Sequence, residues 1–79
     1  MGGEQSKSSD VVIEAFGYTI VEAVRSLRAL LLARHNTPMF QDHQGFYYIE
    51  HRQRKFYVQH QKIELGDYLL CRAYVRVLP

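Results

Sequence analysis

The residues with the clearest capacity for chemistry lie between positions 51 and 62, where four formal positive charges occur without a single acidic residue. Cationic side chains on a β-hairpin can contact phosphates or an acidic protein surface, and neighbouring aromatic rings can stack on unpaired bases. The same stretch also fits a solvated hairpin tip whose cations prevent edge-to-edge aggregation. We predict that it contacts a partner through Arg52, Arg54, Lys55 and Tyr57.

The histidines and the one cysteine do not have the spacing of a metal site or of a nucleophilic pair. No close pair such as C-x₂-C or H-x₃-H occurs among His35, His43, His51, His60 and Cys71. Cys71 falls on the expected core face of a strand, where a cysteine is usually an inert apolar residue. A chain of 79 residues also has little room for an enclosed substrate pocket. We therefore expect a non-enzymatic protein with no catalytic residue, metal or cofactor.

The first ten residues, MGGEQSKSSD, contain glycine, serine and charge and are expected to form a flexible tail. Their start fits M-G-x-x-x-[ST], so Gly2 is a candidate site of N-myristoylation. The same start is similar to that of the lentiviral Nef proteins over nine residues. One acyl chain binds membranes marginally and needs a second signal, which the basic stretch could supply. A lipidated viral adaptor at the cytoplasmic face of a membrane is therefore one alternative.

The rest of the chain, residues 11–79, is expected to form one folded domain, since 47% of the sequence is hydrophobic. With a single cysteine, no internal disulfide is possible, which indicates a reducing cytoplasm. The most apolar run, residues 29–33, is far shorter than the about 20 residues of a membrane-spanning helix.

The elements that must position the basic stretch begin with a strand and a helix. β-formers dominate residues 11–18 and predict a strand. Thr19 and Glu22 then form a T-x-x-E capping box, in which Thr19 accepts from the N–H of Glu22 and Glu22 accepts from the N–H of Thr19. Apolar residues at helical spacing predict a helix over 19–34, with Asn36 as a left-handed C-cap and Pro38 preventing continuation.

Three further strands are expected after the connector 36–45. Residues 46–51 and 54–61 are close enough for a hairpin, although no glycine or Asn-Gly pair identifies the turn type. Gly66 and Asp67 indicate a turn before a final alternating strand. We predict an α+β fold of order βαβββ, with one helix packed on a small antiparallel sheet. The predicted core consists of Ile13, Phe16, Val24, Leu27, Leu31, Val58, Leu69, Cys71, Val75 and Val77.

Two short motifs resemble those of small tailed-phage and prophage proteins, in which an EAFQ-aromatic-T strand leads into a helix and a PGDY turn precedes a final strand. The matching residues are Glu14, Ala15, Phe16, Tyr18 and Thr19, followed by Gly66, Asp67 and Tyr68. Gly17 replaces the usual glutamine, and Leu65 replaces the usual proline. The resemblance implies a phage-encoded accessory protein and supplies no catalytic residue.

These observations predict a small phage-type accessory protein that acts as a non-catalytic binding module in the cytoplasm of an infected host cell. A host or phage protein is the expected partner of the basic aromatic hairpin. A nucleic-acid-binding protein is a second alternative, beside the lipidated adaptor, because cations and aromatic rings also suit single strands. An unpaired edge strand would also permit a homodimer.

Overall fold

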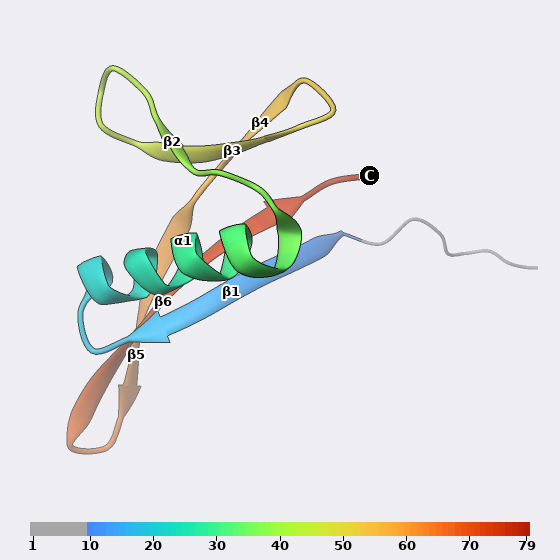
Figure 1. The fold of residues 1–79 in the computed structure, drawn as a ribbon. Coiled ribbons are helices and arrows are strands. Elements are labelled where there is room, and N and C mark those ends of the chain that lie inside the picture. The colour runs from blue at the N-terminus through green and yellow to red at the C-terminus, as the bar shows by residue number, and fades with distance from the viewer. Residues whose placement is uncertain (1–9) are drawn as a thin grey trace, which may run out of the picture.

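The computed structural model describes residues 10–79, and its architecture is α+β, as predicted. One helix is followed and preceded by strands that form two three-stranded sheets rather than the single expected sheet (Figure 1). The elements in chain order are β1 (Val11–Gly17), α1 (Ile20–His35), β2 (Phe40–Gln41), β3 (Tyr47–His51), β4 (Arg54–Tyr57), β5 (Gln59–Leu65) and β6 (Tyr68–Val77).

The first sheet, here called sheet A, has the antiparallel order β1-β6-β5. Its central strand places Val75 opposite Ile13, and Cys71 opposite both Gly17 and Lys62. A two-residue turn joins β5 to β6, and Gly66 within it has φ 64°. Positive φ at the first turn position requires glycine in turns of type II′. The predicted turn at Gly66 and Asp67 is confirmed.

Helix α1 begins at the predicted capping residue. Thr19 Oγ1 accepts a hydrogen bond of 3.1 Å from the backbone N–H of Glu22, as expected of the N-cap. The Glu22 carboxylate, however, accepts from the N–H of Tyr18 at 2.9 Å and not from that of Thr19. This half of the predicted capping box is therefore wrong by one residue. This hydrogen bond satisfies the N–H of Tyr18, the residue before the N-cap, and links the end of β1 to the first turn of α1.

The C-terminus of α1 also agrees with the prediction. Asn36 is a left-handed cap with φ 50° and ψ 39°, and Thr37 donates its N–H to the carbonyl of Leu31 at 3.0 Å. Arg34 and His35 occupy the last turn, where positive charge interacts favourably with the helix dipole. Within residues 10–79, α1 has neither the length nor the apolar character needed to cross a membrane.

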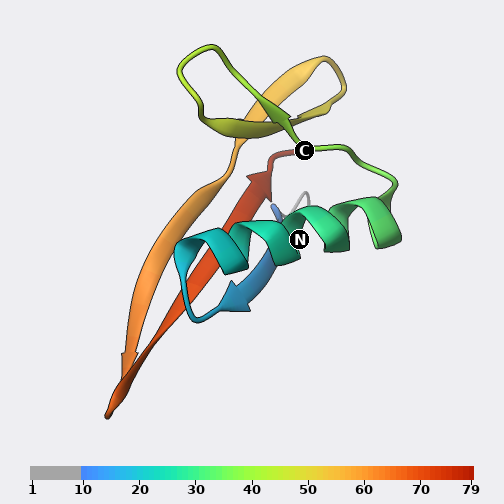
Figure 2. The same ribbon diagram turned by 60° about the vertical axis from the view of Figure 1, so that its left-hand side comes forward.

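The core lies between α1 and sheet A and extends to the inner face of the second sheet. Helix α1 lies against β1 and β6 (Figure 2), and its buried residues Ala23, Leu27 and Leu31 belong to the core. The buried residues are Ala23, Leu27, Leu31, Met39, Ile49, Phe56, Cys71, Ala73 and Val75, with Ile13, Val24, Val58 and Val77 partly buried against them.

Two residues of the predicted core are wrong. Phe16 is 43% exposed and Leu69 is 37% exposed. Strand residues alternate between faces, so Ile13 and Ala15 point toward the helix while Phe16 points to the open face of sheet A. Leu69 lies near the tip of the β5–β6 hairpin, which projects beyond the helix (Figure 2).

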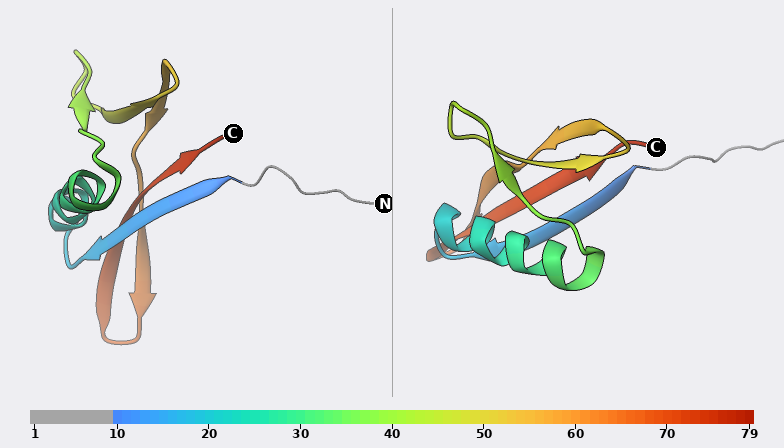
Figure 3. Two further views of the ribbon diagram at one scale, coloured as in Figure 1. Left: turned by 45° about the vertical axis from the view of Figure 1, so that its right-hand side comes forward. Right: turned by 45° about the horizontal axis from the view of Figure 1, so that its top comes forward.

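The second sheet, here called sheet B, has the antiparallel order β2-β3-β4 and lies at one end of sheet A (Figure 3). Its inner face contributes Ile49 and Phe56 to the core. Only Val58 separates β4 from β5, and its N–H donates to the carbonyl of Tyr47 at 2.9 Å. One stretch of chain therefore passes from sheet B into sheet A at this residue.

Most of the predicted tail, including the candidate lipidation residue Gly2, lies outside the described residues. The described part begins at Asp10, whose Oδ2 lies 3.4 Å from Nη1 of Arg76 on β6. This ion pair is exposed and therefore contributes little to stability.

Candidate partner-binding surfaces

The outer face of sheet B carries three aromatic rings in a row, one from each strand. Phe40 lies opposite Tyr48, and Tyr48 lies opposite Tyr57, with ring centroids 5.7 and 5.5 Å apart. The two outer rings remain 41% and 42% exposed. We call Phe40, Tyr48 and Tyr57 the aromatic ladder. The rings are tilted by 35° and 50° to their neighbours, and adjacent rings that keep this much accessible surface are typical of protein interfaces, where aromatic residues are enriched.

Lys55 lies on the same face as the aromatic ladder. Its Nζ is 4.8 Å from the ring centroid of Tyr48, which is a cation–π distance. Glu50 lies directly opposite Lys55 on β3, so the charge of the lysine is locally balanced. The outer face is therefore aromatic with mixed charge and is not a uniformly basic patch.

Asp42 fixes the loop between β2 and β3 and joins it to the aromatic ladder. Its Oδ1 accepts the backbone N–H groups of Gln44 and Phe46, both at 2.9 Å, and its Oδ2 accepts the hydroxyl of Tyr57 at 3.1 Å. The bond from the N–H of Phe46 is the main cause that lowers the pKa of Asp42 below its ordinary 3.8. The same carboxylate raises the pKa of Tyr57, mainly through their hydrogen bond. The neutral phenol and the charged carboxylate thus stabilise each other.

The turn of the β3–β4 hairpin places Arg52 at an exposed tip. Arg52 and Gln53 have φ of 53° and 64°, so both central residues are left-handed, as in a type I′ turn. This turn matches the twist of the flanking strands but normally uses asparagine and glycine. The sequence lacks those residues, which is why it did not indicate the turn type.

Arg54 does not share the outer face with Lys55 and Tyr57. Its Cζ lies 5.2 Å from the ring centroid of Phe56 on the inner face, and its Nη1 donates to the carbonyl of Pro79 at 3.4 Å. The four predicted contact residues are therefore divided. The structure brings Lys55 and Tyr57 together, places Arg52 at the tip, and turns Arg54 toward the end of β6.

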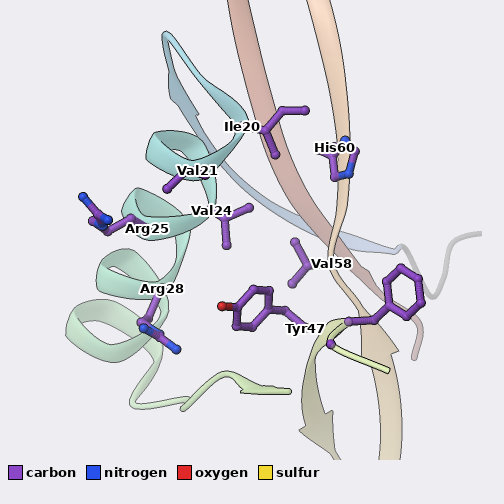
Figure 4. A pocket seen from close by; sticks show the side chains of 10 residues that line it. Ile20, Val21, Val24, Arg25, Arg28, Tyr47, Val58 and His60 are labelled. Atoms are coloured by element: carbon purple, nitrogen blue, oxygen red, sulfur yellow. The ribbon is translucent and has the colours of Figure 1, made fainter. Parts of the chain in front are cut away.

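A second candidate surface, which sequence reasoning missed, is a groove of about 350 Å³ beside α1 (Figure 4). One wall is the N-terminal half of α1, and the other is formed by the β2–β3 loop and the start of β5. Ile20, Val24, Tyr47 and Val58 contribute apolar surface, and Arg25, Arg28 and His60 lie at its edges. We call this site the helix groove. No linear motif marks it, because its residues come from three separate segments.

The helix groove is cationic as well as apolar. Arg28 Cζ lies 5.7 Å from the ring centroid of Tyr47, which holds the guanidinium over one end of the groove. Within residues 10–79, no aspartate or glutamate lines the groove. Among the described residues, neither Arg25 nor Arg28 forms an ion pair. An occupant with negative charge and apolar side chains would be complementary to this surface.

The open face of sheet A carries a polar network around Arg72. Its Nε lies 2.6 Å from Glu14 Oε1, its Nη1 donates to Gln61 at 2.7 Å, and its Cζ lies 4.0 Å from the ring centroid of Tyr74. The network crosses all three strands and satisfies the arginine within the sheet. We assign it a structural role, because these donors are already paired.

Neither the histidines nor Cys71 form a site within residues 10–79. No group of three or more metal-binding side chains occurs there. Cys71 is buried, and its Sγ donates a weak hydrogen bond of 3.9 Å to the carbonyl of Tyr18. A buried thiol in this position packs as a small apolar residue beneath the helix.

The residues that carry the phage resemblance occupy structural positions. Thr19 caps α1, and Gly66 and Asp67 form the β5–β6 turn. The relationship to phage proteins stays a prediction. In comparisons with known proteins, no protein-family model, no curated protein and no solved structure matches this chain.

Proposed function

We propose that this protein is a non-catalytic binding module whose aromatic ladder engages a partner protein. The observation that supports this function is the row of Phe40, Tyr48 and Tyr57 on the outer face of sheet B, with Lys55 over the central ring. Tyrosine and phenylalanine give large contact areas at low entropic cost and dominate the energetics of interfaces. Arg52 at the hairpin tip and Lys55 would orient the partner electrostatically.

The charge of this surface favours a protein over a nucleic acid. Binding to phosphates depends on an excess of cations that release counterions. Here Glu50 lies opposite Lys55, Asp42 binds Tyr57, and Arg54 points toward Pro79. The net field over the ladder is therefore small, whereas a protein partner can match the mixture of rings and opposite charges. The proposed partner is a host or phage protein, in keeping with the motifs at residues 14–19 and 66–68.

The experiment that tests this function is site-specific photo-crosslinking. A benzoylphenylalanine at position 40 would be compared with one at position 29, an exposed position on α1, in cells that carry the gene. We expect one protein to be crosslinked from position 40 and not from position 29. Identification of that protein by mass spectrometry then provides the ligand for quantitative measurements.

Binding of the purified partner would be measured for Tyr48→Ala and for Tyr18→Ala, an equally drastic change at an exposed tyrosine away from sheet B. Loss of a central interface ring costs about 2 kcal/mol, or about 30-fold in Kd. An unchanged Kd for Tyr48→Ala would contradict the assignment. Retardation of labelled DNA with a steep salt dependence would instead indicate a nucleic-acid partner.

A further inference from the structure

Helix α1 covers only part of sheet A. An α-helix is about 10 Å across and strands lie about 4.8 Å apart, so one helix covers about two strands. Here α1 packs on β1 and β6, and β5 is the third strand. His60 and Lys62 lie opposite the buried residues Ala73 and Cys71, so they share the helix-side face of the sheet. Both remain exposed because no element of residues 10–79 covers them.

The helix groove lies along this uncovered strip, between α1 and β5 (Figure 4). Its apolar surface comes from Ile20, Val24 and Val58, which are partly buried against the core. Val21 and Phe46 at its edges are 64% and 62% exposed. These apolar side chains would be removed from contact with water only if another structural element packed beside α1.

The charges that line the groove indicate which kind of side chains an element packed beside α1 would need. Arg25 and Arg28 line the helix wall one turn apart, although the Arg25 side chain extends away from Val58 and His60 (Figure 4). Beyond His60 on β5, Lys62 and Glu64 follow on the same face with opposite charges. Glu22 is the nearest acid on the helix, and its carboxylate is already bound by the N–H of Tyr18. Among the described residues, the formal positive charges that line the groove are therefore those of Arg25 and Arg28 on the helix wall, and neither forms an ion pair there. Acidic side chains on an incoming segment would be complementary to this wall.

We propose that the helix groove binds an acidic amphipathic helix of a partner protein, as a surface distinct from the aromatic ladder. The groove follows α1 from Ile20 to Arg28, a length of about 13 Å or two to three helical turns. A helix that presents apolar residues at i, i+3/i+4 and i+7 would fill the apolar floor, and flanking glutamates would pair with Arg25 and Arg28. The incoming helix would complete the layer that α1 begins over sheet A.

A designed peptide tests this proposal without knowledge of the natural partner. The probe is a lactam-stapled, fluorescein-labelled helix of about 15 residues, with leucine at i, i+4 and i+7 and glutamate on both flanks. Fluorescence anisotropy with the full chain is expected to show saturable binding. A peptide of the same composition with the leucines dispersed around the helix, and one with lysine in place of glutamate, are expected to bind at least tenfold more weakly.

Protein variants locate the peptide on the groove. The double variant Arg25→Glu, Arg28→Glu is expected to weaken binding at least tenfold. The charge-matched control Arg34→Glu, Arg76→Glu, at two exposed arginines outside the groove, is expected to leave it unaltered. Arg25→Gln with Arg28→Gln serves as a second pair, because it removes the charge without adding repulsion to the fold. Tyr48→Ala must have no effect, which separates this site from the proposed ladder.

Three results would overturn the proposal. The first is equal binding of the amphipathic and the dispersed peptide, and the second is full binding by both double variants of Arg25 and Arg28. The third is saturable binding of an extended acidic peptide, or of the small anionic dye anilinonaphthalene sulfonate, at Val24 and Val58 without any binding of the helical peptide. Chemical-shift mapping by NMR distinguishes this last outcome, because it reports which residues each probe contacts.

Discussion

Gly17 lies so close to the first turn of α1 that a β-carbon added to it would stand 2.7 Å from the backbone nitrogen of Ala23. The position is tight because β1 turns into the helix within two residues, and the Glu22 bond to Tyr18 holds that turn closed. We expect Gly17→Ala to reduce the free energy of unfolding by about 1–3 kcal/mol. Urea denaturation measures the change.

The control for this prediction is Gly66→Ala, where the added carbon would meet open space and only the positive φ is unfavourable. Its cost should be at least about 1–2 kcal/mol, because alanine adopts a positive φ only with strain. If Gly17→Ala unfolds at the same urea concentration as the wild-type protein, then Gly17 is not in close contact with the first turn of α1.

The corrected core predicts a large difference between two apolar truncations. Leu27 is fully buried between α1 and sheet A, and Leu27→Ala should cost about 2–5 kcal/mol. Phe16 removes more atoms when truncated, yet Phe16→Ala should cost less than about 2 kcal/mol because its ring is on the open face. Thermal unfolding of both variants checks the order. If Phe16→Ala were more destabilising than Leu27→Ala, then the face of β1 that carries Phe16 would be the one that packs on the helix.

The pair of Asp42 and Tyr57 predicts a specific dependence of stability on pH. The folded state lowers the pKa of Asp42, so its stabilising effect is present above the unfolded value near 3.8 and is lost as the pH falls through the folded value. Asp42→Asn should therefore be less stable than wild type at pH 7, and the difference should shrink below pH 3.8. Acid titration followed by circular dichroism measures this convergence.

Tyr57, the other member of this pair, makes stability depend on pH in the opposite direction. Its pKa is raised in the folded state, so the effect of the neutral phenol is present below the unfolded value of 10.0 and is lost as the pH rises through the folded value. Tyr57→Phe should remove this alkaline dependence while keeping the ring in the aromatic ladder. A wild-type and a Tyr57→Phe curve that stay parallel through this range would show that the hydroxyl bond is absent in solution.

Substitutions at the tip of the β3–β4 hairpin should raise the stability of the fold and weaken partner binding. Arg52 and Gln53 are both left-handed, which costs about 1 kcal/mol or more for each residue other than glycine. The double substitution Arg52→Asn, Gln53→Gly introduces the residues that a type I′ turn favours and should raise the free energy of unfolding by about 1–2 kcal/mol. Affinity for the crosslinked partner should fall if Arg52 contacts it. A more stable variant with unchanged affinity would remove Arg52 from the interface.

Much of the fold could be predicted because its signals are local. Thr19 and Asn36 mark the ends of α1, and Gly66 marks a turn that only a residue tolerant of positive φ can occupy. The division into two sheets could not be predicted in this way. It depends on the change of partner at Val58: its N–H continues the pairing of β4 with β3 by one bond to Tyr47, and from Gln59 onward the chain pairs with β6 instead. Gly17 likewise looked like a departure from a motif, although its packing requires it.

The candidate site could be predicted only in part. The basic stretch does lie on an exposed hairpin, but alternation along β4 places Lys55 and Tyr57 on one face and Arg54 on the other. Strict application of the strand period would have found this division. Phe40, the aromatic neighbour of Tyr48, comes from a strand of two residues in the connector, and no local sequence pattern predicts such a short strand.

The single-residue junction at Val58 has a consequence for how this gene can vary. An inserted or deleted codon there would shift the phase of β5, so that Gln59 and Gln61 would exchange places with His60 and Lys62 beneath the uncovered strip. A length change in the β2–β3 loop would leave the phase of β5 unaltered, although it would disrupt the bonds that Asp42 makes to Gln44 and Phe46. Natural variants of the gene should therefore keep the spacing from Tyr57 to Gln59 constant.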